Sequence, residues 1–137
     1  KDLLESTEDR LIVFYNFNEE LTRHRKVCES LGREVSFVNG SGRSMYAYEE
    51  IPNSVTFIQY QAGAMGGNYQ KANKIIYFTL PLGKGSCDLW EQSKKRIHRI
   101  GQTKTCFYYY LIVKGSFEEK NFAALKEGKE LTDELFT

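Results

Sequence analysis

The stretch "LIVFYNFNEELTRHRKVCESLG", residues 11–32, decides the fold class. Residues 11–17 are almost all apolar, aromatic or β-branched, which is typical of a strand buried on both faces. The following residues begin at Asn18, a candidate N-cap, and show helical spacing of apolar side chains with a glycine at the end: Leu21, Val27, Cys28, Leu31 and Gly32. A buried strand that runs directly into an amphipathic helix predicts a β-α unit of a parallel sheet.

Four further apolar runs resemble the first one. They are "VSFVN" (35–39), "SVTFIQY" (54–60), "KIIYFTL" (74–80) and "CFYYYLIV" (106–113). Helical patterns separate them, at 44–50 (short), at 87–101 and at 116–136, where Ser116 and Glu119 have the spacing of a capping box. Strands that alternate with helices predict a single α/β domain with a mainly parallel sheet and helices on both faces.

The composition excludes several classes of protein. The 137 residues suit one compact domain, and a net charge of +1 says little about partners. Three widely spaced cysteines without a C-x-x-C pattern indicate reduced thiols, not a zinc site or a disulfide framework. His24 and His98 belong to no recognisable catalytic spacing and are predicted to be packing or surface residues. No run approaches the ~18 apolar residues of a membrane span, and the charged start suggests a fragment of a longer chain.

The basic segment "QSKKRIHRIGQ", residues 92–102, is the strongest functional signal. Helical spacings of four and three put Gln92, Arg96 and Arg99 on one face of the helix predicted for 87–101. Its apolar side would pack on the sheet through Leu89, Trp90, Ile97 and Ile100. Arginine suits phosphate because its planar fork donates two parallel hydrogen bonds and keeps its charge. A solvated cationic face is the alternative, and an isolated Arg-x-x-Arg would favour it.

Two glycine-containing loops are expected to follow strands. "QAGAMGGNYQKAN" (61–73) can offer free backbone N–H groups to an anion, although it is neither a P-loop nor G-x-G-x-x-G. "VNGSGRS" (38–44) combines exposed backbone with side chains that can donate to phosphate: Gly40, Ser41, Gly42, Arg43 and Ser44. Taken singly, the first loop is better interpreted as a tight structural turn and the second as an ordinary polar connection.

Together, and in this order, these segments resemble the C-terminal RecA-like lobe of superfamily 2 helicases, specifically the Swi/Snf family of DNA-dependent ATPases. "QSKKRIHRIGQ" is similar to motif VI (Q-x-x-x-R-x-H-R-x-G-Q) and "QAGAMGGNYQKAN" to motif V. "LIVFYNFNEEL" resembles motif IV, and "YYYLIVKGSFEEK" the usual continuation. The short segment after Gly42 and the lack of W-N-P depart from chromatin remodellers and point to a bacterial or phage branch. Three further departures lie in motif V, at Ala64, Gly67 and Asn73.

The resemblance implies a RecA-like three-layer domain over residues 1–137, the second lobe of an ATP-driven DNA translocase or helicase. ATP with Mg would be bound mainly by an N-terminal lobe of the same protein. Arg96 and Arg99 would reach that ATP, with Arg99 as the expected arginine finger. The remaining nucleotide contacts would come from Gln92, Gly63, Gly66 and Asn68. Double-stranded DNA would be contacted through its backbone by Gly40, Ser41, Arg43 and Ser44.

Neither a Walker A lysine loop nor a D-E-x-H box occurs in the 137 residues, so the isolated chain is expected to hydrolyse nothing. The expected location is the cytoplasm of a bacterial or phage-infected cell. Two other functions stay open. One is a non-catalytic nucleic-acid-binding or docking domain that kept the fold. The other is an RNA helicase of a sister family, against which the "HRIGQ" ending argues.

Overall fold

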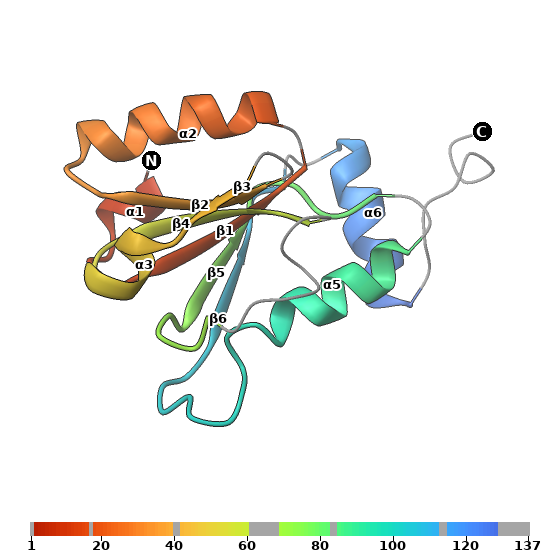
Figure 1. Cartoon of the computed structure of the whole chain (residues 1–137). Helices are drawn as coiled ribbons and strands as arrows, with labels where there is room; N and C mark the ends of the chain where they lie inside the picture. Colours follow the sequence, from red (N-terminus) through yellow and green to blue (C-terminus); the bar gives the residue numbers. More distant parts are fainter. Residues whose placement is uncertain are drawn as a thin grey trace.

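The computed structural model describes residues 2–16, 18–39, 42–60, 69–82, 85–112 and 115–128. These residues form a six-stranded sheet with helices packed against it (Figure 1). The strands are β1 (Leu11–Tyr15), β2 (Val35–Asn39), β3 (Gly42–Ser44), β4 (Val55–Gln59), β5 (Lys74–Tyr77) and β6 (Phe107–Tyr110). The helices are α1 (Asp2–Glu5), α2 (Asn18–Ser30), α3 (Tyr46–Glu50), α5 (Ser86–Lys94) and α6 (Phe117–Lys126).

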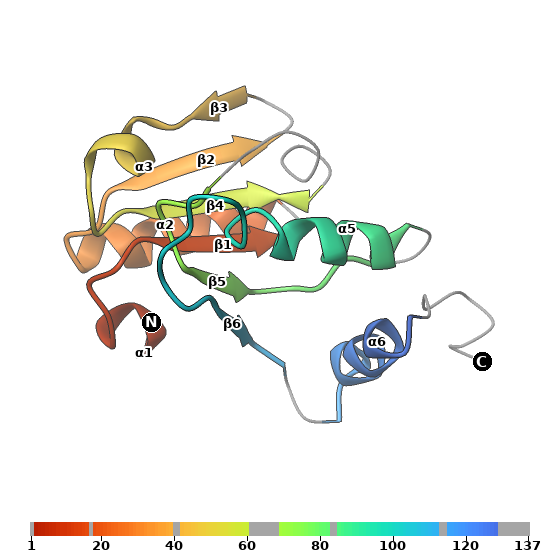
Figure 2. The same cartoon turned by 90° about the horizontal axis from the view of Figure 1, so that it is seen from below.

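The strands lie in the order β3-β2-β4-β1-β5-β6, which Figure 2 shows from below. All neighbouring strands are parallel except β3, which runs antiparallel to β2. At the centre of the sheet, Val13 of β1 lies beside Phe57 of β4 and Ile76 of β5. The predicted mainly parallel sheet is therefore confirmed. The loop predicted for residues 38–44 is wrong in part, because β2 and β3 pair as a short hairpin with Phe37 opposite Ser44.

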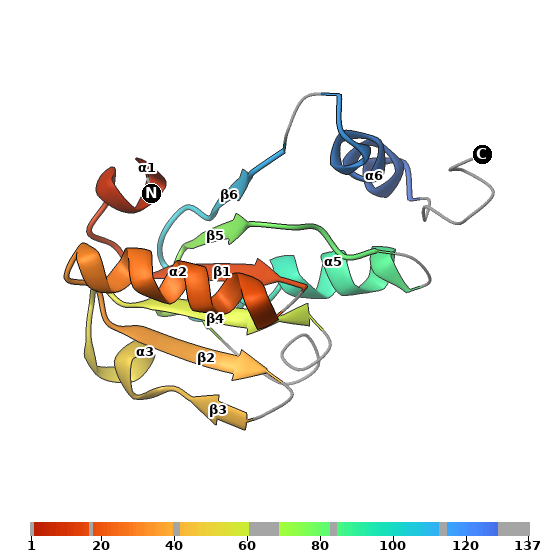
Figure 3. The same ribbon diagram turned by 90° about the horizontal axis from the view of Figure 1, so that it is seen from above.

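Helices cover both faces of the sheet, as the apolar strands predicted. Successive residues of β1 are buried on alternate sides, and the whole strand is inaccessible to solvent. On one side, Leu11 and Val13 pack with Leu21 and Cys28 of α2, which lies over the middle of the sheet in Figure 3. On the other side, α3, α5 and α6 contribute buried residues to a larger cluster: Tyr48, Trp90 and Leu125.

Two sequence interpretations on α2 are confirmed. The helix ends at Ser30, and Gly32 follows with a φ of 71°, a conformation that glycine adopts without strain. His24 is a packing residue: its ring lies 5.7 Å from the ring of Phe57 and 4.2 Å from that of Phe78. Burial lowers the pKa of His24, so the neutral imidazole is the form that this site favours.

Arg33, to which the sequence pattern assigned no role, is a buried structural cation with 4% of its surface exposed. Its guanidinium donates hydrogen bonds to four backbone carbonyls. The distances are 2.8 Å to Asn53 O, 2.8 Å to Leu4 O, 2.6 Å to Thr7 O and 2.6 Å to Asp9 O. The side chain thus joins the N-terminal segment, the end of α2 and the turn before β4.

The capping box predicted at Ser116 does not form. Ser116 is the N-cap of α6, but its side chain makes no capping hydrogen bond. The Glu119 carboxylate instead accepts a hydrogen bond of 2.6 Å from the backbone N–H of Gly115. The glutamate therefore satisfies a donor one residue before the position that the pattern indicated.

The remaining compositional expectations concern cysteines and membrane spans. Cys28, Cys87 and Cys106 are free thiols, as predicted. Burial raises the pKa of Cys28 to about 11, which keeps its thiol protonated and unreactive. In the described ranges, no helix combines the length and the apolar character that crossing a membrane requires.

Candidate functional site

The helix predicted for residues 87–101 is shorter than expected, because α5 ends at Lys94. The chain then continues in tight turns through Gly101. Two backbone carbonyls in this stretch are bound by distant groups. The Tyr108 hydroxyl donates to Lys94 O at 3.0 Å, and the Tyr69 N–H donates to Arg96 O at 2.7 Å. A longer helix would need these carbonyls for its own N–H groups. Residues 95–102 are called the arginine turn below.

The arginine turn is anchored at both ends. Ile97 is fully buried in the core cluster that also contains Trp90, as the pattern predicted. The Gln102 side-chain amide donates to Ala72 O at 2.8 Å, to Ile97 O at 3.0 Å and to Gln70 O at 3.2 Å. These bonds hold the turn against the chain that leads into β5. Gln102 matched motif VI, but the sequence did not indicate this role.

Ile100 was predicted to pack on the sheet, and this prediction is wrong. Its surface is 99% exposed, because the helix that would have turned it inward ends before it. Together with Lys95, His98 and Arg99, Ile100 lines an open depression of about 460 Å³. Within the described part of the chain, Arg99 is exposed and forms no ion pair. A cation is therefore presented to solvent beside an apolar side chain and further basic groups.

Arg96 and Arg99 influence each other electrostatically. Burial lowers the pKa of the half-buried Arg96, and the positive charge of Arg99 lowers it further, while Tyr69 acts in the opposite direction. Arginine nevertheless stays charged at neutral pH. Two like charges held in one turn repel, and an anion between them would relieve that repulsion. Gln92 lies in the last turn of α5, where its carbonyl accepts the Lys95 N–H at 3.2 Å.

Tyr69 connects the arginine turn with Arg43, the arginine that was predicted to contact DNA. Its side chain is 2% exposed, and its backbone N–H bonds to Arg96 O. Burial raises the pKa of the Tyr69 phenol, and the charges of Arg43 and Arg96 both oppose that shift. Arg43 of the β3 edge strand and Arg96 of the arginine turn therefore act on the same hydroxyl. No pattern in the sequence placed these two arginines near one residue.

The structure describes only some of the other predicted site residues. Ser44 is exposed on β3, opposite Phe37 of β2. Five predicted residues lie outside the described residues, and their roles stay predictions: Gly40, Ser41, Gly63, Gly66 and Asn68.

Polar side chains that the sequence analysis did not consider join the carboxyl ends of the central strands. The amide of Gln59, the last residue of β4, donates to Asn16 O at 3.0 Å. The Asn16 amide donates in turn to Thr79 Oγ1 at 3.0 Å and to Leu80 O at 2.9 Å. In parallel α/β sheets the carboxyl edge is where ligands usually bind. These bonds hold that edge in one arrangement beside β2, whose end leads into the predicted DNA loop.

The donors at the arginine turn fit phosphate better than metal. Arg96, Arg99 and Lys95 supply N–H groups and positive charge, which ATP phosphates would accept. In the ranges that the structure covers, no three histidine, cysteine, aspartate or glutamate side chains come together as a metal site would require. The donors of the arginine turn thus fit phosphate.

Comparisons with known proteins agree with this geometry. No family model matches the chain. The chain is 27% identical over 136 residues to the human DNA repair and recombination protein RAD54-like, covering 92% of this chain and 18% of that protein. It is 26% identical over 136 residues to the Xenopus laevis SWI/SNF-related matrix-associated actin-dependent regulator of chromatin subfamily A-like protein 1, covering 92% and 14%. The rice (Oryza sativa subsp. japonica) DNA excision repair protein CSB is 30% identical over 122 residues, covering 86% and 9%.

A solved structure shows the same fold. The C-terminal part of the Fun30 ATPase domain matches with a TM-score of 0.71 and 24% sequence identity, over 98% of this chain and 43% of that chain. The predicted RecA-like α/β fold is thereby confirmed. The similarity to a SWI/SNF-related protein agrees with the resemblance found in the motifs, and the likeness to the Fun30 structure shows the shared fold. The chain spans less than a fifth of the length of these relatives, at 18%, 14% and 9%.

Proposed function

We propose that residues 1–137 form the second RecA-like lobe of an ATP-driven DNA translocase of the Swi/Snf type. In this proposal the lobe supplies Arg96 and Arg99 to ATP and Mg held mainly by an N-terminal lobe of the same protein. The loop and strand at residues 40–44 contact the backbone of double-stranded DNA. The full-length protein is then a DNA-dependent ATPase, and the isolated lobe is inactive.

One observation carries the proposal. The backbone bond from Tyr69 N to Arg96 O, 2.7 Å long, joins the chain that follows the glycine-rich loop to the arginine turn. The segments that resemble motifs V and VI, far apart in the sequence, therefore meet in space. Such a meeting is expected of a shared nucleotide site, whereas a solvated cationic face would not need it.

Each arginine has a distinct part in the proposed reaction. Arg99 is exposed and lines the open depression, so it is the group that can extend toward a bound nucleotide. There it would neutralise charge that develops on the transferring phosphoryl group. Arg96 is half-buried beside Tyr69, so its guanidinium is held more firmly and would orient the phosphates. Gln92, Gly63, Gly66 and Asn68 complete the proposed nucleotide contacts.

The bacterial or phage source, with a cytoplasmic location, is supported only by the sequence departures. These are the short segment after Gly42 and the lack of W-N-P. The relatives compared above are from human, frog and rice. The proposed chemistry does not depend on the source.

ATP turnover tests the division of labour between the two lobes. The full-length protein is expected to hydrolyse ATP at an enzyme-like rate, on the order of 1–10³ per second, when DNA is present. The 137-residue chain, purified alone, is expected to show no turnover with or without DNA, because it lacks a phosphate-cradling lysine loop. Turnover by the isolated chain that Arg99→Ala abolishes would contradict the two-lobe proposal. A full-length protein that binds DNA but never hydrolyses ATP would instead favour the docking-domain alternative.

Salt dependence of binding tests the DNA contact at Arg43. Each phosphate that a protein neutralises contributes about 0.9 to the slope of log K against log salt. Arg43→Ala in the full-length protein should therefore weaken DNA binding equally for all sequences and reduce that slope by about one unit. Arg23→Ala, which removes an exposed arginine from α2, is the matched control and should leave the slope unchanged. An unchanged slope for Arg43→Ala would remove Arg43 from the DNA interface.

A further inference from the structure

We propose that Tyr48 is a positioning residue for Arg96, acting through the segment 69–72 that lies between them. This inference rests on the proposed function and adds a residue that none of the motifs contains. Tyr48 belongs to α3, on the chain between the predicted DNA loop and β4. Tyr48 and the arginine turn belong to different parts of the chain, and hydrogen bonds of segment 69–72 connect them.

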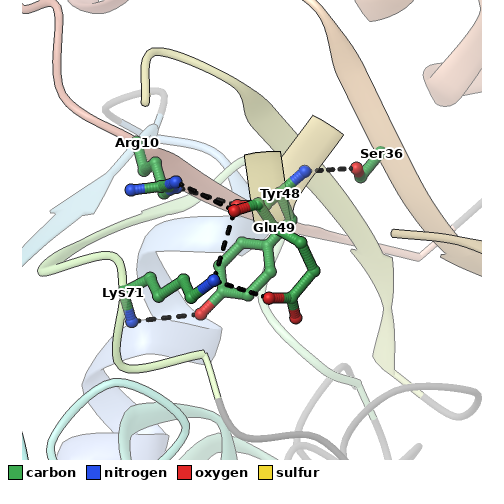
Figure 4. A network of polar contacts seen from close by, with 5 residues as sticks. All are labelled: Arg10, Ser36, Tyr48, Glu49 and Lys71. Atoms are coloured by element: carbon green, nitrogen blue, oxygen red, sulfur yellow. Dashed lines mark hydrogen bonds and ion pairs between the residues drawn. The ribbon is translucent and has the colours of Figure 1, made fainter. Parts of the chain in front are cut away.

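Tyr48 is itself held in place from several sides. Its side chain is 3% exposed. Its backbone N–H donates to Ser36 Oγ of β2 at 2.9 Å, and its carbonyl accepts from Arg10 Nε at 2.8 Å (Figure 4). The Arg10 guanidinium also lies 5.9 Å from the centre of the Tyr48 ring. The hydroxyl at the tip of the ring is therefore presented from a rigid support.

The Tyr48 hydroxyl binds the backbone of segment 69–72 at Lys71. It accepts a hydrogen bond of 3.0 Å from the backbone N–H of Lys71. The Lys71 ammonium returns to α3, where it binds the Glu49 carboxylate at 2.6 Å and the Glu49 carbonyl at 3.2 Å (Figure 4). The Tyr48 ring also packs edge-on against Tyr69, with 5.7 Å between centroids and an interplanar angle of 89°. One side of segment 69–72 is thus fixed entirely by α3.

The other side of segment 69–72 is hydrogen-bonded to the arginine turn. Tyr69 N donates to Arg96 O at 2.7 Å, and Gln102 donates to Gln70 O and Ala72 O. The bond from Ala72 N to Tyr69 O, 3.0 Å long, closes the segment into a turn, so that its two sides move together. A displacement at the Lys71 N–H therefore reaches Arg96 through a chain of backbone hydrogen bonds.

The inference depends on the hydroxyl of Tyr48 more than on its ring. A phenylalanine would fill the same core position and keep the contact with Tyr69. Burial raises the pKa of Tyr48 to about 12, so the group stays a neutral hydroxyl at every pH at which the protein works. A change of Tyr48→Phe therefore removes one acceptor and leaves the packing intact, which separates positioning from core stability.

The test uses the full-length protein and a double-mutant cycle. Tyr48→Phe is expected to lower kcat for ATP hydrolysis about five- to tenfold, because small displacements of a group that orients substrate are costly. KM for ATP and the affinity for DNA should stay unchanged. In an Arg96→Ala background the same change should have no further effect on kcat, since the residue through which it acts is gone.

Asn121→Ala is the matched control for stability. The buried Asn121 amide on α6 donates to Pro81 O at 3.0 Å and has no bond to segment 69–72. Its loss should lower the melting temperature without the kcat effect. A normal kcat for Tyr48→Phe would overturn the inference, and so would an equal fall of kcat in the Arg96→Ala background. If Arg96→Ala and Arg99→Ala both kept normal kcat, the proposed function itself would be contradicted. This outcome differs from the two results that overturn only the role of Tyr48.

Discussion

Replacing Arg99 by alanine in the full-length protein is expected to lower the DNA-stimulated kcat for ATP hydrolysis by about a hundredfold or more. The reason is that a charged donor would be lost where negative charge develops in the transition state. The substitution should leave folding unaffected, because Arg99 is exposed and forms no ion pair among the described residues. KM for ATP and DNA affinity should change much less than kcat, since the interaction is made mainly in the transition state.

Two companion variants sharpen this measurement. Arg99→Lys should restore little activity, because an ammonium cannot donate two parallel hydrogen bonds from one plane. Arg23→Ala removes an exposed arginine from α2, which packs on the opposite face of the sheet, and should retain full activity. Near-normal kcat for both Arg99→Ala and Arg99→Lys would reduce the arginine turn to a solvated cationic surface.

Replacing Arg33 by alanine should be the most destabilising single change among the polar residues described above. It removes four hydrogen bonds from a buried guanidinium to the carbonyls of Asn53, Leu4, Thr7 and Asp9. Hydrogen bonds from charged groups are individually strong, but water entering the site will satisfy part of what is lost. A fall of about 3 kcal/mol in the free energy of unfolding is expected, measured by urea denaturation of the chain.

The control for Arg33 is Arg25 on α2. Its guanidinium is solvent-exposed and lies 5.6 Å from the ring centre of Phe37, so Arg25→Ala should cost only about 0.5 kcal/mol. Arg33→Lys should be nearly as unstable as Arg33→Ala, because one ammonium cannot reach all four carbonyls, which lie on the N-terminal segment and on the turn before β4. A loss below about 0.5 kcal/mol for Arg33→Ala would show that the N-terminal segment is held by its apolar contacts alone.

The class of fold and the central strands could be predicted from the sequence alone. β1, β2, β4, β5 and β6 all lie within the apolar runs. For β1, β4 and β5 the reason is burial on both faces, which leaves a continuous local signal. Burial of Trp90 and Ile97 was predictable for the same reason. The motif spacing around Arg96 and Arg99 could also be recognised in one dimension, since it depends on neighbouring residues in the chain.

The end of α5 and the surroundings of Arg96 and Arg99, which follow it, depend on contacts between distant segments. The helical pattern continues to Gly101, yet Tyr108 and Tyr69 take the carbonyls of Lys94 and Arg96. Both donors come from segments whose approach no local pattern records. The same holds for β3, which becomes a strand only because β2 offers it an edge. It also holds for Arg33, whose acceptors lie on the N-terminal segment and on the turn before β4. Hydrogen bonds to the backbone from groups far away in the chain leave no signature in residue type, and this is why the shape of the site could not be derived from the sequence.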